Sequence, residues 1–303
     1  MKTYKQESFS FAGFVMTYNR PKILLESIRE IFKQSLSPEI LLIIDNSENN
    51  YTKYAIEKLN NPKIKYIKMP ENIGPAGAAN RGVKFLSELG YDWIYWGDDD
   101  DPPKFPNIFI NLVEIASKNE NTGAIGSVGS KFDFKNGLTV RFKDEELKGV
   151  LSADTIGGGH NLILNGEAIR KTGVLPDPKL FFGFEEFDFL QRLKKVGYSI
   201  LVSGDSLFQH RKASNRLNYK INRKLIPKLD EAASKRKYYS YRNHIYIFYH
   251  KLGLKRLAIL IIIRATMKVF MGYFNGFKFG NRNAIYTFSA IFDGLTKKLG
   301  KHE

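Results

Sequence analysis

The sequence contains no cysteine. This absence excludes disulfides, thiolate zinc sites and cysteine nucleophiles, and it fits a reducing compartment on the cytosolic side of a membrane. A secretory signal is not expected either, because the charged start of the chain leads into a short apolar stretch, residues 9–16, that predicts a strand. The chemistry must therefore come from carboxylate, imidazole, hydroxyl and cationic side chains.

Acidic residues are scarce in the last third of the chain. Residues 211–303 contain 21 Lys and Arg but only four Asp and Glu, a net charge of +17. Residues 1–210 contain 26 basic and 27 acidic residues and are almost neutral. A near-neutral body with a basic tail indicates that the tail meets an anionic surface while the body carries the chemistry. We therefore expect a catalytic domain over residues 1–210 and a basic, aromatic-rich helical region over residues 211–303.

Short apolar runs alternate with amphipathic helical patterns in the first half of the chain. The expected strands are residues 11–18, 41–45, 64–69 and 93–96, and the expected helices are residues 21–32 and 76–89. Irregular strands and a hairpin are expected over residues 123–150, and a strand over residues 162–164. Two helices, residues 167–171 and 184–196, and a last strand, residues 200–202, should follow. This order predicts an α/β fold with a mostly parallel sheet flanked by helices.

Polar residues gather where the expected strands end. They are Thr17, Asn19 and Arg20, then Asp45 and Asn46, then Asn72 and Gly74, and finally the run from Asp98 to Asp101. Ligands of open α/β sheets bind outside the carboxyl ends of the strands. The sequence therefore predicts a binding site at this edge of the sheet.

The run of four aspartates, Asp98 to Asp101, follows directly on an aromatic strand. In an extended segment Asp98 and Asp100 would point to one side and Asp99 and Asp101 to the other. Two carboxylates on one side suit a hard divalent cation such as Mg²⁺ or Mn²⁺. The alternative is a solvated acidic turn before prolines, but four adjacent acids repel one another unless a cation offsets them.

A second acidic cluster, Glu185, Glu186 and Asp188, opens an expected helix after an aromatic segment. Acids near a helix N-terminus are favourable in themselves. A carboxylate among aromatic residues can also act as a general base, and the residues alone do not say which of the three would do so. His160, after three glycines, and His210, before two cations, are each open to a structural or a ligand role.

The basic tail contains one apolar run, residues 257–263, that is too short to span a bilayer. Flanking Lys, Arg, Phe and Tyr residues predict an element that lies on an anionic membrane surface. One alternative is a helix packed on the catalytic domain with a solvated basic face. Another is a nucleic-acid-binding tail, in which the apolar run would have no use.

These motifs resemble the family 2 glycosyltransferases, which have the GT-A fold, over about residues 11–250. The resemblance rests on Thr17-Tyr18-Asn19-Arg20-Pro21, Asp45-Asn46-Ser47, Asn72-Ile73-Gly74-Pro75-Ala76-Gly77, the triple Asp and Tyr238-Tyr239-Ser240-Tyr241-Arg242-Asn243. Within the family the sequence is most similar to bacterial galactofuranosyltransferases and rhamnosyltransferases. The first three motifs look like the nucleotide-binding half of such enzymes, which places Thr17, Asn19, Asn72 and Gly74 on the substrate.

The resemblance also implies roles for charged residues near the donor. Asp98 and Asp100 would bind Mn²⁺ or Mg²⁺, and Asp99 would lie near the ribose or the sugar. Asp45 would meet the nucleobase, and Arg20 would approach the diphosphate of a UDP- or dTDP-sugar.

For the transfer step the resemblance implies that Glu186 is the catalytic base, with Glu185 and Asp188 beside the substrate. His210 falls where the galactofuranosyltransferases have a metal-binding histidine, and His160 would contact substrate. The sequence departs from the family in two places, since the base is commonly Asp and since His160-Asn161 replaces a pair of tryptophans near the acceptor.

The implied reaction is metal-dependent and inverting, because one base without a protein nucleophile means direct displacement. It would move galactofuranose or rhamnose to a hydroxyl of a glycan or lipid-linked acceptor in cell-surface polysaccharide synthesis. A nucleotidyltransferase, the rival enzyme, would need a glycine-rich basic phosphate loop near the N-terminus, and the sequence has none. The expected location is cytoplasmic, peripheral on the inner face of the cell membrane.

Overall fold

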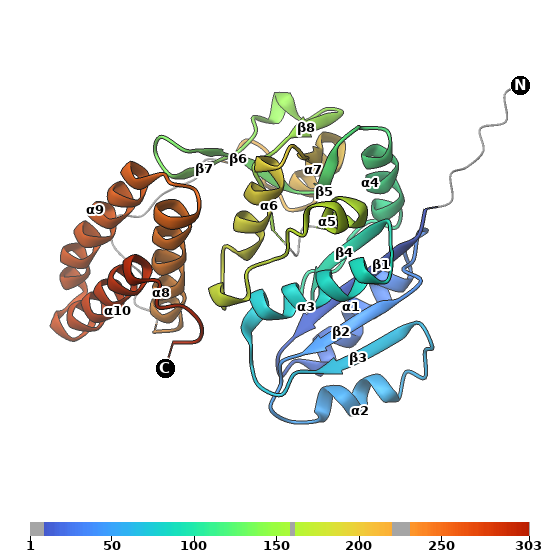
Figure 1. The fold of residues 1–303 in the computed structure, drawn as a ribbon, viewed down its shortest axis with the longest axis horizontal. Helices are drawn as coiled ribbons and strands as arrows, with labels where there is room; N and C mark the ends of the chain where they lie inside the picture. The colour runs from blue at the N-terminus through green and yellow to red at the C-terminus, as the bar shows by residue number, and fades with distance from the viewer. Residues whose placement is uncertain (1–8, 158–160, 220–230, 303) are drawn as a thin grey trace, which may run out of the picture.

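The computed structural model describes residues 9–157, 161–219 and 231–302 (Figure 1). At its centre lies an eight-stranded mixed sheet with the order β3-β2-β1-β4-β10-β5-β11-β8. Its strands are β1 Phe11–Thr17, β2 Leu41–Asp45, β3 Ile64–Lys68, β4 Trp93–Asp98, β5 Thr122–Gly126, β8 Val150–Ser152, β10 Leu162–Asn165 and β11 Ser199–Ser203. A small sheet beside it contains β6 Gly129–Asp133, β7 Leu138–Val140 and β9 Thr155–Ile156.

The half of the sheet formed by β1 to β4 is parallel throughout. Side chains of β1 alternate between two cores, since Ala12, Phe14 and Met16 belong to one and Phe11 and Val15 to the other. This alternation follows from the twofold side-chain repeat of a strand with both faces covered. All four strands therefore end at the same edge of the sheet.

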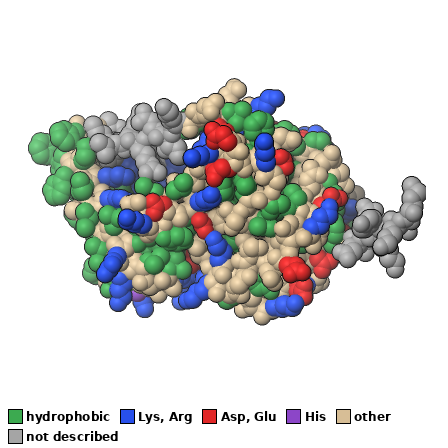
Figure 2. Space-filling view, turned by 90° about the horizontal axis from the view of Figure 1, so that it is seen from above, with side chains coloured by type: hydrophobic (Ala, Val, Ile, Leu, Met, Phe, Trp, Pro, Cys, Tyr) green, Lys and Arg blue, Asp and Glu red, His purple; other side chains and the backbone are tan. Residues whose placement is uncertain are grey.

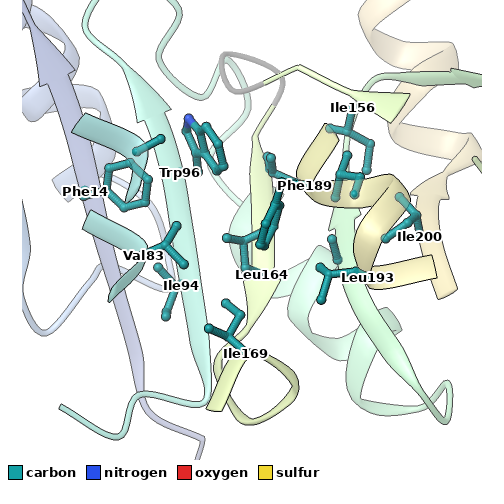
Figure 3. Packing of buried hydrophobic residues seen from close by; sticks show 14 of the residues in the cluster. Phe14, Val83, Ile94, Trp96, Ile156, Leu164, Ile169, Phe189, Leu193 and Ile200 are labelled. Carbon is teal, nitrogen blue, oxygen red and sulfur yellow. The ribbon is translucent and has the colours of Figure 1, made fainter. Parts of the chain in front are cut away.

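Helices cover both faces of the sheet. They are α1 Pro21–Phe32, α2 Tyr51–Glu57, α3 Gly74–Glu88, α4 Ile108–Ser117, α5 Gly166–Thr172, α6 Glu185–Lys195 and α7 Gly204–Ala213. The core between the sheet and α3, α5 and α6 centres on Trp96, which packs between Phe14 and Phe189 with ring centroids 5.7 and 6.1 Å away (Figure 3). The other core contains residues of α1 and α4.

The second half of the sheet is mixed. Strand β10 runs antiparallel to both β4 and β5, whereas β5 and β11 are parallel. The structure thus confirms the predicted mostly parallel sheet flanked by helices, with a helical C-terminal region. Helices α2, α4 and α7 are absent from the expectations above, and His210, expected after a strand, lies in α7.

The C-terminal region consists of helices that lie together at one end of the molecule (Figure 1). They are α8 Glu231–Tyr246, a π-helical turn Ile247–Lys251, α9 Lys255–Gly272 and α10 Phe277–Thr296. Leu257, Ala258 and Ile261 of α9 join a core with Phe132 and Phe187 of the catalytic part. The division at residue 210 falls inside α7 and stays a prediction.

The apolar run 257–263 belongs to a longer helical stretch, Lys255–Asn275. By length and composition alone this stretch could cross a membrane, so the expectation that the apolar segment is too short to do so needs correction. A third of its most apolar window is buried within the protein. Part of its apolar character therefore serves the packing of α9 on the rest of the chain.

Candidate active site

A cavity of about 340 Å³ opens at the carboxyl ends of β1, β2 and β4 and at the N-terminus of α6. It brings together the first strand end, the aspartate run and the second acidic cluster. The charged and polar residues that line it include Thr17, Arg20, Asn46, Asp98, Asp99, Asp100, Glu185 and Glu186. Five carboxylates thus face one cavity, and Arg20 is the only Lys or Arg among its described lining residues.

The aspartate run does not continue the strand. β4 ends at Asp98, and Asp99 and Asp100 form a turn, so the alternation expected of an extended segment does not hold. Buried Asp99 accepts a hydrogen bond from Thr17 Oγ1 at 2.6 Å and an ion pair from Arg20. Arg20 also binds Asp100 with 2.6 Å between Nη1 and Oδ2. The turn is therefore held against the end of β1.

Asp98 has a strongly perturbed acidity. Burial raises its pKa to about 7, and repulsion from Glu186 and from Asp100 adds to the effect. The pKa of Asp99 is also raised by burial, although Thr17 and Arg20 act in the opposite direction. Buried acids at a cavity with elevated pKa values are typical of functional sites, because each would be stabilised by a cation.

Glu185 and Glu186 begin α6 but occupy different environments. Glu185 is buried, and burial together with repulsion from Glu186 raises its pKa well above the ordinary value. Glu186 is only partly buried and lines the cavity. The two neighbouring acids therefore differ in exposure: Glu185 is almost fully buried at the cavity wall, and Glu186 is the more accessible of the two.

Asp188 lies on another face of α6 and does not line the cavity. Its carboxylate accepts from Arg192 at 2.7 Å and from Lys251 at 2.9 Å, and its side chain is fully buried. Lys251 also pairs with Asp177 at 2.6 Å. These contacts join α6 to the C-terminal region, and the substrate contact expected of Asp188 stays a prediction.

Asp45 lies beneath the site. Its two carboxylate oxygens accept from the Tyr66 hydroxyl at 2.7 Å and from the Ser47 backbone N–H at 2.8 Å. The neighbouring Asn46 lines the cavity, and its amide donates to the Gly74 carbonyl at 3.2 Å. Asn46 was expected among the polar residues at this edge but without a role of its own, and its place in the cavity wall makes it a candidate for ligand contact.

Asn19, Asn72 and Gly74 surround the cavity without being among the residues that line it. Asn19 has a left-handed backbone with φ of 57°, and its side chain accepts from Asn49. Asn72 lines a neighbouring cavity of about 450 Å³ and accepts from the Gly74 N–H at 2.9 Å. Gly74 has φ of 70°, and a Cβ there would lie 2.2 Å from the Phe181 carbonyl oxygen.

His210 lines a different cavity, of about 380 Å³, together with Asp101, Lys104 and Arg211. Its ring meets Phe105 edge-on, with centroids 5.2 Å apart. Over residues 9–157, 161–219 and 231–302, no three His, Asp or Glu side chains are grouped closely enough to hold a metal ion by themselves. His160 lies outside the described residues.

Comparisons with known proteins agree with this geometry. Residues 14–157 match the family model described as Glycosyl transferase family 2. Galactofuranosyltransferase GlfT1 of Mycolicibacterium smegmatis is 24% identical over 261 residues, which are 80% of this chain and 84% of the relative. GlfT1 of Mycobacterium tuberculosis is 23% identical over 260 residues, with coverage of 82% and 84%.

A solved structure shows the same fold. Mannosyltransferase PcManGT from Pyrobaculum calidifontis, in complex with GDP-Man and Mn²⁺, superposes with a TM-score of 0.59 at 15% identity and covers 98% of this chain and 89% of that chain. The GT-A fold that the sequence predicted is thereby confirmed. Residues 14–157 form a family 2 glycosyltransferase domain, and the chain is a glycosyltransferase.

Proposed function

We propose that this glycosyltransferase moves galactofuranose from its UDP-sugar to a hydroxyl of a glycan or lipid-linked acceptor, with inversion, in cell-surface polysaccharide synthesis. The observation that carries the proposal is that Asp98 to Asp100 from β4 and Glu186 from α6 line one cavity. Two relatives are named galactofuranosyltransferases, which favours this sugar. Rhamnose from a dTDP-sugar is the second donor that the sequence predicts.

The donor set of the cavity fits a divalent cation, Mn²⁺ or Mg²⁺, held by Asp98 and Asp100. Both ions prefer carboxylate oxygens, and the diphosphate of the donor can complete the coordination that two carboxylates leave open. The raised pKa of Asp98 supports this fit, because a cation would relieve the repulsion that raises it. When bound, the ion supplies Lewis-acid stabilisation of the departing diphosphate. The role of His210 as a metal ligand stays a prediction, since His210 lines the separate cavity that it shares with Asp101 and Lys104.

The chain's own residues would orient the donor at the carboxyl ends of β1 and β2. Thr17 and Arg20 fix the aspartate turn, and the guanidinium of Arg20 remains partly exposed toward a diphosphate. Asn46 lines the cavity beside them, and Asp45 accepts a hydrogen bond from the backbone N–H of the adjacent Ser47. A donor bound in this way would have its anomeric carbon near the N-terminus of α6, where Glu186 lies.

Glu186 is the proposed general base. It takes the proton of the acceptor hydroxyl as that oxygen attacks the anomeric carbon, and the bond from this carbon to the diphosphate oxygen breaks on the opposite face. The electron pair of the broken bond leaves with the nucleoside diphosphate, so the configuration inverts. Glu185 is less suited to the role because it is buried, and burial favours its protonated form.

A donor panel tests this function. Purified protein is incubated with UDP-galactofuranose, UDP-galactopyranose or dTDP-rhamnose, with Mn²⁺, Mg²⁺ or excess EDTA, and release of nucleoside diphosphate is measured. We expect turnover with UDP-galactofuranose and a divalent ion, and NMR of the product should show the inverted anomer. Turnover with dTDP-rhamnose alone would replace the sugar in the proposal, and a retained anomeric configuration would overturn the mechanism.

We further propose that the outer face of α9 and α10 rests on the anionic inner surface of the cell membrane. Large apolar side chains are exposed on this face at helical spacing: Ile259, Ile263, Met267, Phe270, Phe274, Phe277, Ile285, Phe288 and Phe292. Figure 2 shows hydrophobic side chains at the end of the molecule where these helices lie, with Lys and Arg among them. Such a surface, within a region of net charge +17, favours acidic lipid headgroups.

A further inference from the structure

The motif Tyr238-Tyr239-Ser240-Tyr241-Arg242-Asn243 lies on α8, outside the catalytic sheet, and its last two side chains are fully buried. The Asn243 amide nitrogen donates to three backbone carbonyls, those of Leu180 at 3.0 Å, Phe182 at 3.0 Å and Gly183 at 2.8 Å. Arg242 Nη2 donates to the Leu180 carbonyl at 2.7 Å. Two neighbouring side chains of one helix thus bind the backbone of a single loop.

Residues 180–184, the loop that Asn243 binds, have an unusual backbone. Phe181, Gly183 and Phe184 have φ angles of 59°, 81° and 69°. Left-handed conformations are disfavoured for aromatic residues, so contacts from outside the loop must hold them. Arg242 and Asn243 provide such contacts by donating hydrogen bonds from α8 to the loop carbonyls.

Aromatic packing reinforces the same arrangement. The Tyr239 ring stacks on Phe181 with centroids 5.3 Å apart and lies 5.9 Å from Phe182. The His244 ring lies 3.7 Å from that of Phe184. Consecutive residues of the loop therefore rest on one face of α8.

This loop leads directly into the helix turn that carries the proposed catalytic base, Glu186. Phe182 and Gly183 line the active-site cavity, and Phe184 is the N-cap of α6, immediately before Glu185 and Glu186. The direction of the first turn of α6 depends on the backbone of its N-cap. A displacement of the loop would therefore move the Glu186 carboxylate relative to the acceptor hydroxyl.

We infer that Arg242 and Asn243 are positioning residues that hold the loop 180–184, and through it the Glu186 carboxylate, in place for proton transfer. The inference rests on the proposed role of Glu186. It assigns to the C-terminal helices a part in the transfer step, since α8 is itself fixed to α10 by the hydrogen bond from the Tyr238 hydroxyl to Asp293 at 2.6 Å.

The test compares Asn243→Ala with Asn283→Ala. Asn283 is an equally buried asparagine in the same helical region, and its amide donates to the Lys268 carbonyl between α10 and α9, away from the loop. Both variants should lose thermal stability. Only Asn243→Ala should lower kcat, by about 10²-fold as expected for a catalytic group misplaced by about 1 Å, with the donor KM unchanged. A normal kcat for Asn243→Ala, or equal losses of kcat in both variants, would overturn the inference.

A double variant separates this inference from the base assignment. If Glu186 is the base, Asn243→Ala should add little to the loss of kcat already caused by Glu186→Gln. Full additivity of the two losses would refute positioning through Glu186. If Glu186→Gln alone keeps normal kcat, the proposed base is wrong, whereas a kcat loss specific to Asn243→Ala still shows that the loop is positioned.

Tyr239→Ala covers the case in which Asn243→Ala does not fold. Tyr239 is only partly buried, and its loss removes the ring contacts with Phe181 and Phe182 while leaving the hydrogen bonds of Asn243. It should lower kcat in the same direction at unchanged donor KM. An unchanged kcat in Tyr239→Ala, when Asn243→Ala is unfolded, would count against the inference.

Discussion

Replacing Glu186 with glutamine should remove the proposed proton acceptor while keeping the length of the side chain and most of its hydrogen-bonding capacity. General base catalysis contributes about 10²- to 10⁴-fold to enzymatic rates, so kcat should fall by this factor. The loss corresponds to about 3 to 5 kcal/mol of transition-state stabilisation. Donor KM should change little, because the proposed donor contacts come from β1, β2 and β4.

The structure also predicts what Glu186→Gln does to stability. Glu186 repels Asp98 and helps to raise the pKa of that carboxyl to about 7. Removing this negative charge lets Asp98 ionise more easily, so the variant should melt at the same temperature as the wild type or higher. A loss of activity would then have no explanation in unfolding.

Glu185→Gln is the matched control in the same turn of α6. Burial raises the pKa of Glu185 and favours its neutral form, and glutamine is a neutral group of nearly the same shape. We expect nearly normal kcat and similar stability.

Initial rates of nucleoside diphosphate release, measured over a range of donor and acceptor concentrations, decide between these outcomes. Full kcat in Glu186→Gln with a large loss in Glu185→Gln would transfer the base role to Glu185. Normal kcat in both would refute single-base displacement at this site.

Three further predictions concern the metal, the membrane face and acid stability. Asp98→Asn and Asp100→Asn should each abolish turnover, as should excess EDTA with the wild type; full activity in EDTA would contradict a metal requirement. The double variant Phe270→Ser, Phe274→Ser should bind anionic liposomes less strongly at high salt in a flotation assay, because apolar contacts resist salt. Its kcat on a soluble acceptor should stay normal. Unchanged flotation would refute the proposed membrane-binding face. Burial lowers the pKa of His244 to about 4. Below its ordinary pKa of about 6.5, the histidine therefore takes up a proton in the unfolded chain but not in the folded chain. The free energy of unfolding should fall by about 3 kcal/mol as the pH drops from 6.5 to 4. His244→Phe should flatten this part of the pH–stability curve measured by urea titration, and an unaltered curve would argue against the shift.

Local sequence patterns were sufficient to predict the parallel half of the sheet and the edge of the sheet at which the candidate site lies. The strands before Thr17, Asp45 and Asp98 were predictable because apolar runs end at polar residues, and parallel strands bring those ends together. The aspartate turn lies at this edge, as its position suggested, whereas the presence of Glu185 and Glu186 in the same cavity had been expected only from the family resemblance.

Contacts between distant segments were not predictable in this way. Asp188 shares a helical turn with two glutamates, but its direction is decided by Lys251, 63 residues later. The burial of Arg242 and Asn243 depends equally on where α8 packs. His210 was expected in a segment after a strand, whereas the cap formed by Ser203 on the Ser206 N–H begins α7 and places the histidine within a helix.

Gly74 determines how closely the two halves of the active site approach each other. The Phe181 carbonyl oxygen, which accepts from the Ala76 N–H at 3.1 Å, occupies the space that a side chain at position 74 would need. The absence of a side chain at Gly74 thus allows the start of α3 to lie close to the loop that precedes α6. Any larger residue in the Asn-x-Gly motif would alter the alignment of donor and acceptor, so a defect at Gly74 should be measured as slower transfer and not only as weaker nucleotide affinity.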